Sequence, residues 1–225
     1  MIKIENIETF GFEAAIHGMR NPMNSWDKSD SDYRNEFEDS FYLGENDLAL
    51  MKKLAKAGSD HRKFMRFITV NMDIIAPLYW WKEFDTYKVG TVRNSCSTMH
   101  CIHKNPFIVD DFSHEHLLDS YTDDDAYYDD ECCDEIYADE CLALTINVLN
   151  YYRKKYLATK NKKYWWQMIQ LLPSSYNQRA IVQLNYEVLR NMYHNRKAHK
   201  LDEWVEFCKE IEYLPYSELI TGGTE

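Results

Sequence analysis

The chain is poor in the residues and patterns that mark several common protein classes. Its 225 residues include only seven glycines and five prolines, and neither a Walker loop nor a glycine-rich dinucleotide fingerprint is present. No stretch approaches the roughly 18 uninterrupted apolar residues that a membrane-spanning helix needs. The first ten residues, MIKIENIETF, alternate like a strand and lack the apolar run of a signal peptide. The sequence therefore predicts a cytoplasmic protein with no membrane span.

Cysteine is present, but without a secretory context. Six cysteines in a chain with no signal peptide indicate reduced thiols. Six side chains stand close enough in sequence to be weighed as zinc ligands: Cys96, His100, Cys101, His103, Cys132 and Cys133. Adjacent cysteines cannot easily reach one ion together, and the gap between Cys96 and Cys101 is loose for paired ligands. Free thiols and no metal site are therefore expected. No Ser/His/Asp set suggests a catalytic triad.

The net charge of −11 is distributed unevenly along the chain. Residues 105–152 hold 14 Asp and Glu and no Lys or Arg, whereas residues 153–200 hold 11 Lys and Arg and the single acid Glu187. An acidic segment followed by a basic one favours a phosphate or polyanion site on the basic part. The alternative is two solvated faces that pair with each other or with a neighbouring subunit. Both interpretations stay open.

Hydrophobic periodicity predicts an α+β fold in which helices flank a central, largely antiparallel sheet. Strands are predicted near residues 2–12, 65–73 and 178–184. Residues 18–35, which are rich in Asn, Asp and Ser, are predicted to be a loop. Helices are predicted over residues 46–58, 76–84, 135–156, 162–172 and 201–211, and after Asn185. We expect a single domain over residues 1–225 with an acidic insert around residues 105–135.

Local structure and charge agree best between Leu172 and His199. Pro173 ends the preceding helix, and residues 178–184 form an apolar strand. Asn185 then stands where a helix N-cap is expected. One face of the helix that follows carries Leu189, Met192, Tyr193 and Arg196. An arginine at the end of an inward face needs a partner, and a phosphate, a polar ring or a carboxylate would serve.

This stretch resembles the C-terminal signature of flavin-dependent thymidylate synthases. The similarity rests on Leu172-Pro173, Arg179, Asn185, Asn191 and Arg196, which are separated by six, six, six and five positions. Members of that family convert dUMP to dTMP with FAD, methylene-tetrahydrofolate and NADPH. They are homotetramers whose sites lie between subunits. The resemblance implies that Asn185 and Asn191 contact the flavin and that Arg196 contacts the pyrimidine ring.

The family also places a histidine four residues after that arginine. Here His199 follows Arg196 by three residues, and the resemblance makes it a further cofactor-binding candidate. Near the N-terminus only short fragments of the family's motifs are present. These are Arg20 with Ser25, and the run Gly58-Ser59-Asp60-His61.

The family's main motif, R-H-R-x-x-S-x-N-E-x-S-x-R-Y, is only partly present. Counted from Trp80-Trp81, its first three positions are Lys82, Glu83 and Phe84. In the second half Asn94 and Ser97 match, whereas residues 99 and 100 depart from the motif's arginine and tyrosine. The resemblance implies phosphate binding by Lys82, substrate binding by Ser97 and cofactor binding by Asn94.

Two functions follow from these observations. The resemblance implies a divergent relative that methylates dUMP or another pyrimidine nucleotide, with FAD as cofactor and NADPH and methylene-tetrahydrofolate as co-substrates. The resemblance implies that such an enzyme needs no cysteine nucleophile, because the reduced flavin carries the one-carbon unit and the electrons while the protein positions the rings and neutralises phosphate. The alternative is a non-catalytic nucleotide-binding or protein-interaction module that presents its acidic residues 105–152 to a protein partner. The tryptophan pairs 80–81 and 165–166 favour core or interface positions, and a homotetramer is expected.

Overall fold

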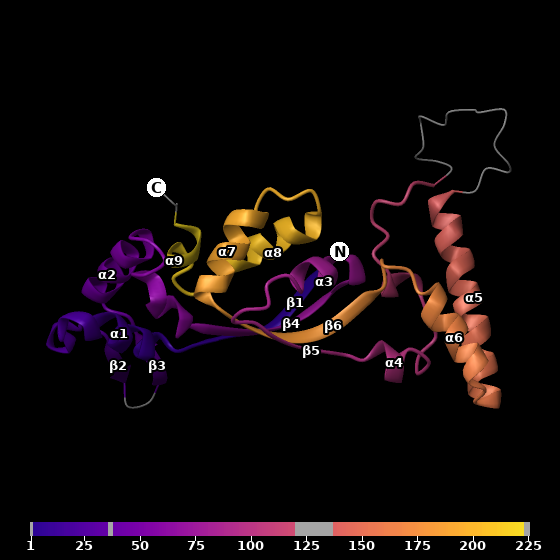
Figure 1. Ribbon diagram of the computed structural model, residues 1–225, viewed down its shortest axis with the longest axis horizontal. Coiled ribbons are helices and arrows are strands. Elements are labelled where there is room, and N and C mark those ends of the chain that lie inside the picture. Colours follow the sequence, from indigo (N-terminus) through magenta and orange to yellow (C-terminus); the bar gives the residue numbers. More distant parts are fainter. Residues whose placement is uncertain (1, 36–37, 120–136, 223–225) are drawn as a thin grey trace. The chain divides into compact units, whose positions relative to one another are not determined.

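A computed structural model describes residues 2–35, 38–119 and 137–222 of the chain. The expected α+β class with a central antiparallel sheet is confirmed (Figure 1). Four strands form this sheet in the order β1-β4-β6-β5. They are β1 (Lys3–Phe10), β4 (Thr69–Pro77), β5 (Val92–Ser95) and β6 (Asn177–Asn185). Most of the acidic run, residues 120–136, lies outside the described residues.

Two predictions about strands are wrong in detail. Residues 18–35 are not all loop, because β2 (Asp32–Asn35) pairs with β3 (Glu38–Tyr42) in an antiparallel hairpin. Backbone pairing thus overrides a polar composition that is typical of loops. The strand predicted from residue 65 begins only at Thr69. Residues Arg62–Arg66 form a 3₁₀ turn that buries Phe64 and Met65.

The predicted helices are all present, with ends that differ by a few residues. The described helices are α1 (Phe12–Arg20), α2 (Glu45–Lys56), α3 (Leu78–Phe84), α4 (Thr98–Cys101), α5 (Ala138–Thr159), α6 (Lys162–Leu171), α7 (Tyr186–Arg196), α8 (Asp202–Glu212) and α9 (Glu218–Thr221). The helices α1, α4 and α9 were not predicted. Both α4 and α9 have only four residues, which is too short for a helical period to show in the sequence.

The contacts divide the chain into two compact units. Unit 1 comprises residues 75–81 and 95–179, and unit 2 comprises residues 2–74, 82–94 and 180–225. Within unit 1, α5 and α6 pack side by side (Figure 1). Its core is formed by apolar side chains from both sides of the acidic run: Ile102, Phe107, Phe112, Leu142, Leu149 and Met168. Trp80 and Trp81 are both fully buried, whereas Trp166 is 44% exposed.

In unit 2 the sheet has one buried and one open face. Burial alternates along β6 and along β4 as far as Ala76, so that Val70 and Met72 face inward with Val182 and Leu184. Helices α7 and α8 lie over the sheet in Figure 1. On the open face, Gln183 Nε2 on β6 donates a hydrogen bond of 3.0 Å to Asn71 Oδ1 on the neighbouring strand β4. This alternation is the period of two that the sequence shows.

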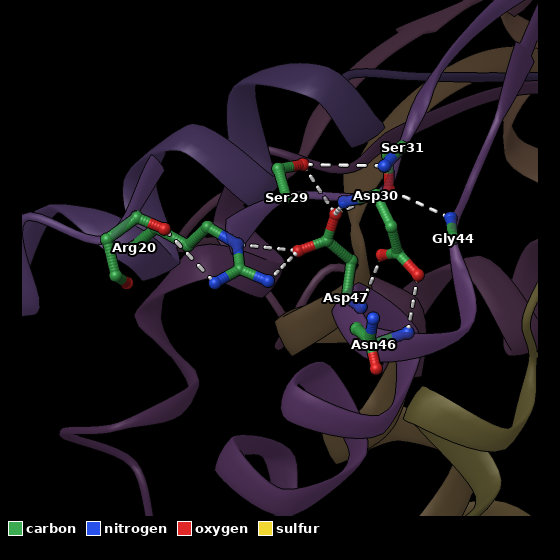
Figure 2. A network of polar contacts seen from close by, with 8 residues as sticks. Arg20, Ser29, Asp30, Ser31, Gly44, Asn46 and Asp47 are labelled. Atoms are coloured by element: carbon green, nitrogen blue, oxygen red, sulfur yellow. Dashed lines mark hydrogen bonds and ion pairs between the residues drawn. The ribbon is translucent and has the colours of Figure 1, made fainter. Parts of the chain in front are cut away.

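A buried ion pair anchors the N-terminal part of unit 2 (Figure 2). Arg20 donates from Nε and Nη2 to Asp47 Oδ1, at 2.6 Å in each case. The other oxygen, Oδ2, accepts from the hydroxyls of Ser29 and Ser31, also at 2.6 Å. Arg20 Nη1 donates to the Ser25 carbonyl at 3.2 Å, so these two residues of the N-terminal motif fragment are in contact. The network joins α1, the segment after it and α2.

The charges in this network are balanced by hydrogen bonds. Burial by itself would raise the pKa of Asp47, but Ser29, Ser31 and Arg20 together hold it below its ordinary value. In the same region Asp30 caps the start of α2, because its carboxylate accepts from the backbone N–H groups of Asn46 and Asp47 at 2.9 and 3.0 Å. The helix N-terminus is therefore capped by a side chain from a distant segment.

Candidate functional site

Unit 2 contains a cavity of about 570 Å³ beside the start of α7. Three segments line it: the 3₁₀ turn at residues 62–66, the loop before β5, and α7 with its cap. The lining residues are Arg62, Arg66, Val89, Gly90, Asn185, Glu187, Val188, Arg190, Asn191, His194 and Asn195. This volume lies within the range of small-molecule and cofactor sites.

Asn185 occupies the junction between β6 and α7. Its Oδ1 accepts from the Val188 N–H at 3.0 Å, which confirms the predicted N-cap. Its Nδ2 faces Gly90, where an added Cβ would lie only 2.8 Å away. Gly90 also has a φ of +78°, a conformation that side-chain-bearing residues rarely adopt. Glycine at position 90 therefore leaves room for the amide at the cavity wall.

Asn191 lines the same cavity from the exposed side of α7. Its Oδ1 accepts from Asn195 Nδ2 at 2.9 Å. The two asparagines that the resemblance marks as flavin contacts thus share one cavity. Their amide groups supply donors and acceptors suited to the polar edge of a flat ring.

Arginines give the cavity a positive wall, but two of the three are engaged within the protein. Arg62 Nε lies 3.0 Å from both carboxylate oxygens of Glu187. Arg190 is buried, and its Nη1 donates to carbonyl oxygens at the end of α9: Leu219, Ile220 and Gly222. Burial lowers the pKa of Arg190, and nearby Arg62 adds to that effect. These two side chains shape the wall rather than offer free charge.

Arg66 differs from its neighbours in the cavity. It is exposed, and within residues 2–35, 38–119 and 137–222 it has no ion-pair or hydrogen-bond partner. An anionic group in the cavity would therefore find an available guanidinium there. His194 adds a neutral group, because burial, with help from Arg190 and Lys197, lowers its pKa. Its imidazole is uncharged at neutral pH.

Arg196 does not line this cavity. Its guanidinium is held in a separate cluster of unit 2, where Nη1 donates to Glu83 Oε2 at 2.7 Å and Nε to the Tyr87 hydroxyl at 2.9 Å. The guanidinium carbon also lies 4.8 Å from the centre of the Trp204 ring. Of the partners that the sequence leaves open, the structure provides a carboxylate. It comes from Glu83, which stands at the second position of the family's R-H-R motif.

His199 belongs to the Arg196 cluster. Its Nδ1 accepts from the Leu201 N–H at 3.2 Å. Nε2 lies 3.4 Å from Glu83 Oε2 and 2.8 Å from Arg196 Nη1. Trp204 Nε1 donates to the same Glu83 oxygen at 3.2 Å. Glu83 is therefore the centre of a network that fixes both Arg196 and His199.

The remaining predicted site residues lie elsewhere. Lys82 is exposed near the end of α3, and Asn94 is exposed on β5; neither lines the cavity. Ser97 belongs to unit 1, where its carbonyl oxygen accepts from the Cys101 N–H at the start of α4. The structure thus brings Asn185 and Asn191 together, and separately Arg196 and His199.

Sequence reasoning missed the cationic residues of the cavity. Arg62 and Arg66 are four residues apart in the sequence. Arg190 and His194 are also four residues apart, and Asn191 lies between them. In an α-helix a spacing of four places side chains on one side, so the signal was present for Arg190 and His194. The periodic apolar residues of α7 mark its buried face, whereas the cavity lies along its polar face.

Within the described ranges, no group of three or more His, Cys, Asp or Glu side chains is arranged to hold a metal ion. Cys96, Cys101, Cys141 and Cys208 are free thiols, and Cys132 and Cys133 lie outside the described residues. None of the described helices combines the length and apolarity needed to cross a membrane.

The fold is that of flavin-dependent thymidylate synthases. No protein-family model and no curated protein matches the chain. Among solved structures, one of the flavin-dependent thymidylate synthase ThyX from Helicobacter pylori, complexed with FAD and dUMP, is similar over 98% of this chain and 100% of its own. The TM-score is 0.66 and the sequence identity 15%. A second structure of the same enzyme with FAD and dUMP covers 97% of this chain and 96% of its own, with a TM-score of 0.64 and 15% identity. The resemblance seen in the sequence is thereby confirmed for the fold.

Proposed function

We propose that this chain is a divergent flavin-dependent thymidylate synthase that binds FAD and methylates dUMP or a related pyrimidine nucleotide. One observation carries the proposal. Asn185 and Asn191 line a single cavity together with the available guanidinium of Arg66, on a fold whose solved examples hold FAD and dUMP. NADPH and methylene-tetrahydrofolate are the proposed co-substrates.

The residues of the cavity suit a flavin nucleotide. The amides of Asn185 and Asn191 would hold the polar edge of the isoalloxazine, and Arg66 would neutralise a phosphate. The ion pair between Arg62 and Glu187 keeps that wall in place before any ligand arrives. When bound, the flavin would supply the electrons and the one-carbon transfer, which are the cofactor's own chemistry. The protein's part is to orient the rings and exclude water.

Arg196 would orient the pyrimidine in this proposal. Its Nε and Nη1 are engaged by Tyr87 and Glu83, whereas Nη2 has no hydrogen-bond partner among the residues described. That remaining N–H group is a donor in a fixed direction, suited to a ring carbonyl. Lys82 is the proposed phosphate contact of the nucleotide, whereas Asn94, Ser97 and His199 do not line the cavity and are assigned no contact with the flavin there.

Titration with FAD tests the cofactor site, with quenching of flavin fluorescence as the measurement. Asn185→Asp keeps the oxygen that caps α7 but removes the amide donor, and Arg66→Gln removes the available charge. We expect each to weaken FAD binding by about tenfold or more, because each removes a hydrogen-bonding or charged partner. Lys63→Gln is the matched control, since Lys63 is exposed near Arg66 but does not line the cavity. Unchanged FAD affinity in both cavity variants, or no binding to the unaltered protein, would contradict the proposal.

The pairing of Glu83 with Arg196 favours a second candidate, a non-catalytic nucleotide-binding or protein-interaction module. A carboxylate at this position already satisfies the guanidinium that the family uses for the pyrimidine. Under this alternative the acidic residues 105–152 bind the protein partner. The two candidates separate by assay: the enzyme forms dTMP from dUMP when FAD and both co-substrates are supplied. The module forms none, and deletion of residues 119–134 abolishes its binding to a partner.

A further inference from the structure

A basic surface with aromatic rings covers the helical hairpin of α5 and α6 in unit 1. Residues 141–186 contain no Asp or Glu. The exposed lysines of the hairpin are Lys154, Lys155, Lys160, Lys162 and Lys163. None of these five ammonium groups forms an ion pair with a carboxylate within the described parts of the chain. The cavity described above lies in unit 2 and uses none of these residues.

Aromatic rings accompany these lysines. Lys155 Nζ lies 5.0 Å from the ring centre of Tyr151 and 5.8 Å from that of Tyr164. Lys162 lies 5.5 Å from the ring centre of Trp166. Tyr151 and Trp166 are 53% and 44% exposed, so part of each ring faces solvent. The positive charges are therefore held beside planar surfaces that face solvent.

The hairpin presents these groups on a rigid support. Asn150 exchanges hydrogen bonds with the backbone N–H and carbonyl of Phe107 at 2.9 and 2.8 Å. Arg153 donates to the carbonyls of His103 and Lys104 at 3.0 and 2.9 Å. Arg153 is thus a structural residue, which leaves the lysines as the cations available to a ligand. Leu149 and Met168 are fully buried in the unit 1 core beneath.

We propose that this hairpin surface binds single-stranded nucleic acid. Lysines without a carboxylate partner among the described residues match the phosphate backbone, and exposed Tyr and Trp rings match unstacked bases. A duplex would present its phosphates but bury its bases, so the aromatic groups favour a single strand. An anionic protein partner would use the lysines and leave the rings without a role. The proposal is independent of the FAD site.

Fluorescence anisotropy of the full-length protein with a fluorescein-labelled 20-nucleotide oligo(dT) tests this proposal. Each lysine–phosphate contact on a single strand contributes about 0.7 to the slope of log affinity against log salt. Lys155→Gln/Lys162→Gln/Lys163→Gln should therefore reduce the slope by about 2 and weaken binding at least tenfold. Its matched control is Lys28→Gln/Lys53→Gln/Lys88→Gln, which removes the same charge from exposed positions of unit 2. We expect the control to bind like the unaltered protein.

Trp166 separates stacking from simple charge attraction. Trp166→Ala should weaken oligo(dT) binding about tenfold without changing the salt slope, and Trp166→Phe should restore most of the affinity. Inorganic polyphosphate of equal charge should compete poorly. Equal loss in the two triple variants, or polyphosphate competing as well as oligo(dT), would overturn the proposal. So would a change of molar mass in the hairpin triple variant, because the surface would then be an interface between copies of this chain.

Discussion

At the scale of single residues, the buried pair of Arg20 and Asp47 carries the sharpest stability prediction. Both side chains are almost completely buried, and Arg20 is the positive partner of an Asp47 carboxylate that also accepts from Ser29 and Ser31. Asp47→Asn leaves the Arg20 charge buried without its partner, so we expect a loss of about 3–5 kcal/mol in the free energy of unfolding. Urea unfolding of the variant and the unaltered protein measures this loss. The double variant Arg20→Met/Asp47→Leu leaves no buried charge and should lose less than Asp47→Asn; an equal loss would contradict the reasoning.

The same residue gives the stability a pH dependence of defined sign. Because the folded protein holds the pKa of Asp47 below its unfolded value, the unfolded state takes up the proton first as the pH falls. The contribution of Asp47 is therefore complete above the ordinary carboxyl pKa and is lost as the pH falls through the lowered one. His194 also lowers the stability as the pH falls, but at a higher pH than Asp47. Its pKa is lowered in the folded protein, so the unfolded chain binds the proton more readily. Thermal unfolding between pH 7 and pH 3 should show stability decreasing in two steps. His194→Gln should remove the upper step alone, and an unchanged upper step would exclude His194 as its cause.

At the scale of elements, the loop before β5 matters because of Gly90. A Cβ at this position would lie 2.8 Å from Asn185 Nδ2 and 3.1 Å from Val188 Cγ2. Gly90→Ala should therefore displace the Asn185 amide and weaken FAD binding, in addition to a backbone cost of about 1–2 kcal/mol. Gly58→Ala is the matched control, because Gly58 also has a positive φ of +99° but nothing lies within 4 Å of an added Cβ. If FAD titration gives the same affinity for both variants, crowding of Asn185 is not the cause.

The elements also show what the sequence could predict. Helix α7 and its cap were predictable because Asn185 and the apolar positions after it are local signals. The hairpin of β2 and β3 was not, because its polar residues are typical of loops and its stability depends on backbone pairing. The partner of Arg196 could not be predicted from the sequence either. Glu83 is 113 residues away in the sequence, so no local pattern marks it as the partner.

At the scale of the whole molecule, the prediction from the resemblance is a homotetramer. Unit 2 provides a physical reason for association, because several large apolar side chains of its strands and turns are exposed. Ile7, Phe10, Phe67 and Ile181 are 39%, 49%, 53% and 51% exposed. Exposed large apolar side chains can belong to a surface that another molecule covers. Light scattering should therefore give the mass of four 26.9-kDa chains, about 108 kDa.

Ile181→Lys tests which surface is responsible for association. Ile181 lies on the open face of β6, where burial alternates with the inward Val182. A lysine there would introduce an unpaired charge into any subunit contact, so the variant should dissociate into smaller species. Met23→Lys is the control, because Met23 is 81% exposed and lies outside the sheet. A monomeric mass for the unaltered protein would contradict the tetramer. Equal dissociation of the two variants would show that added charge alone, rather than its place on the open sheet face, separates the subunits.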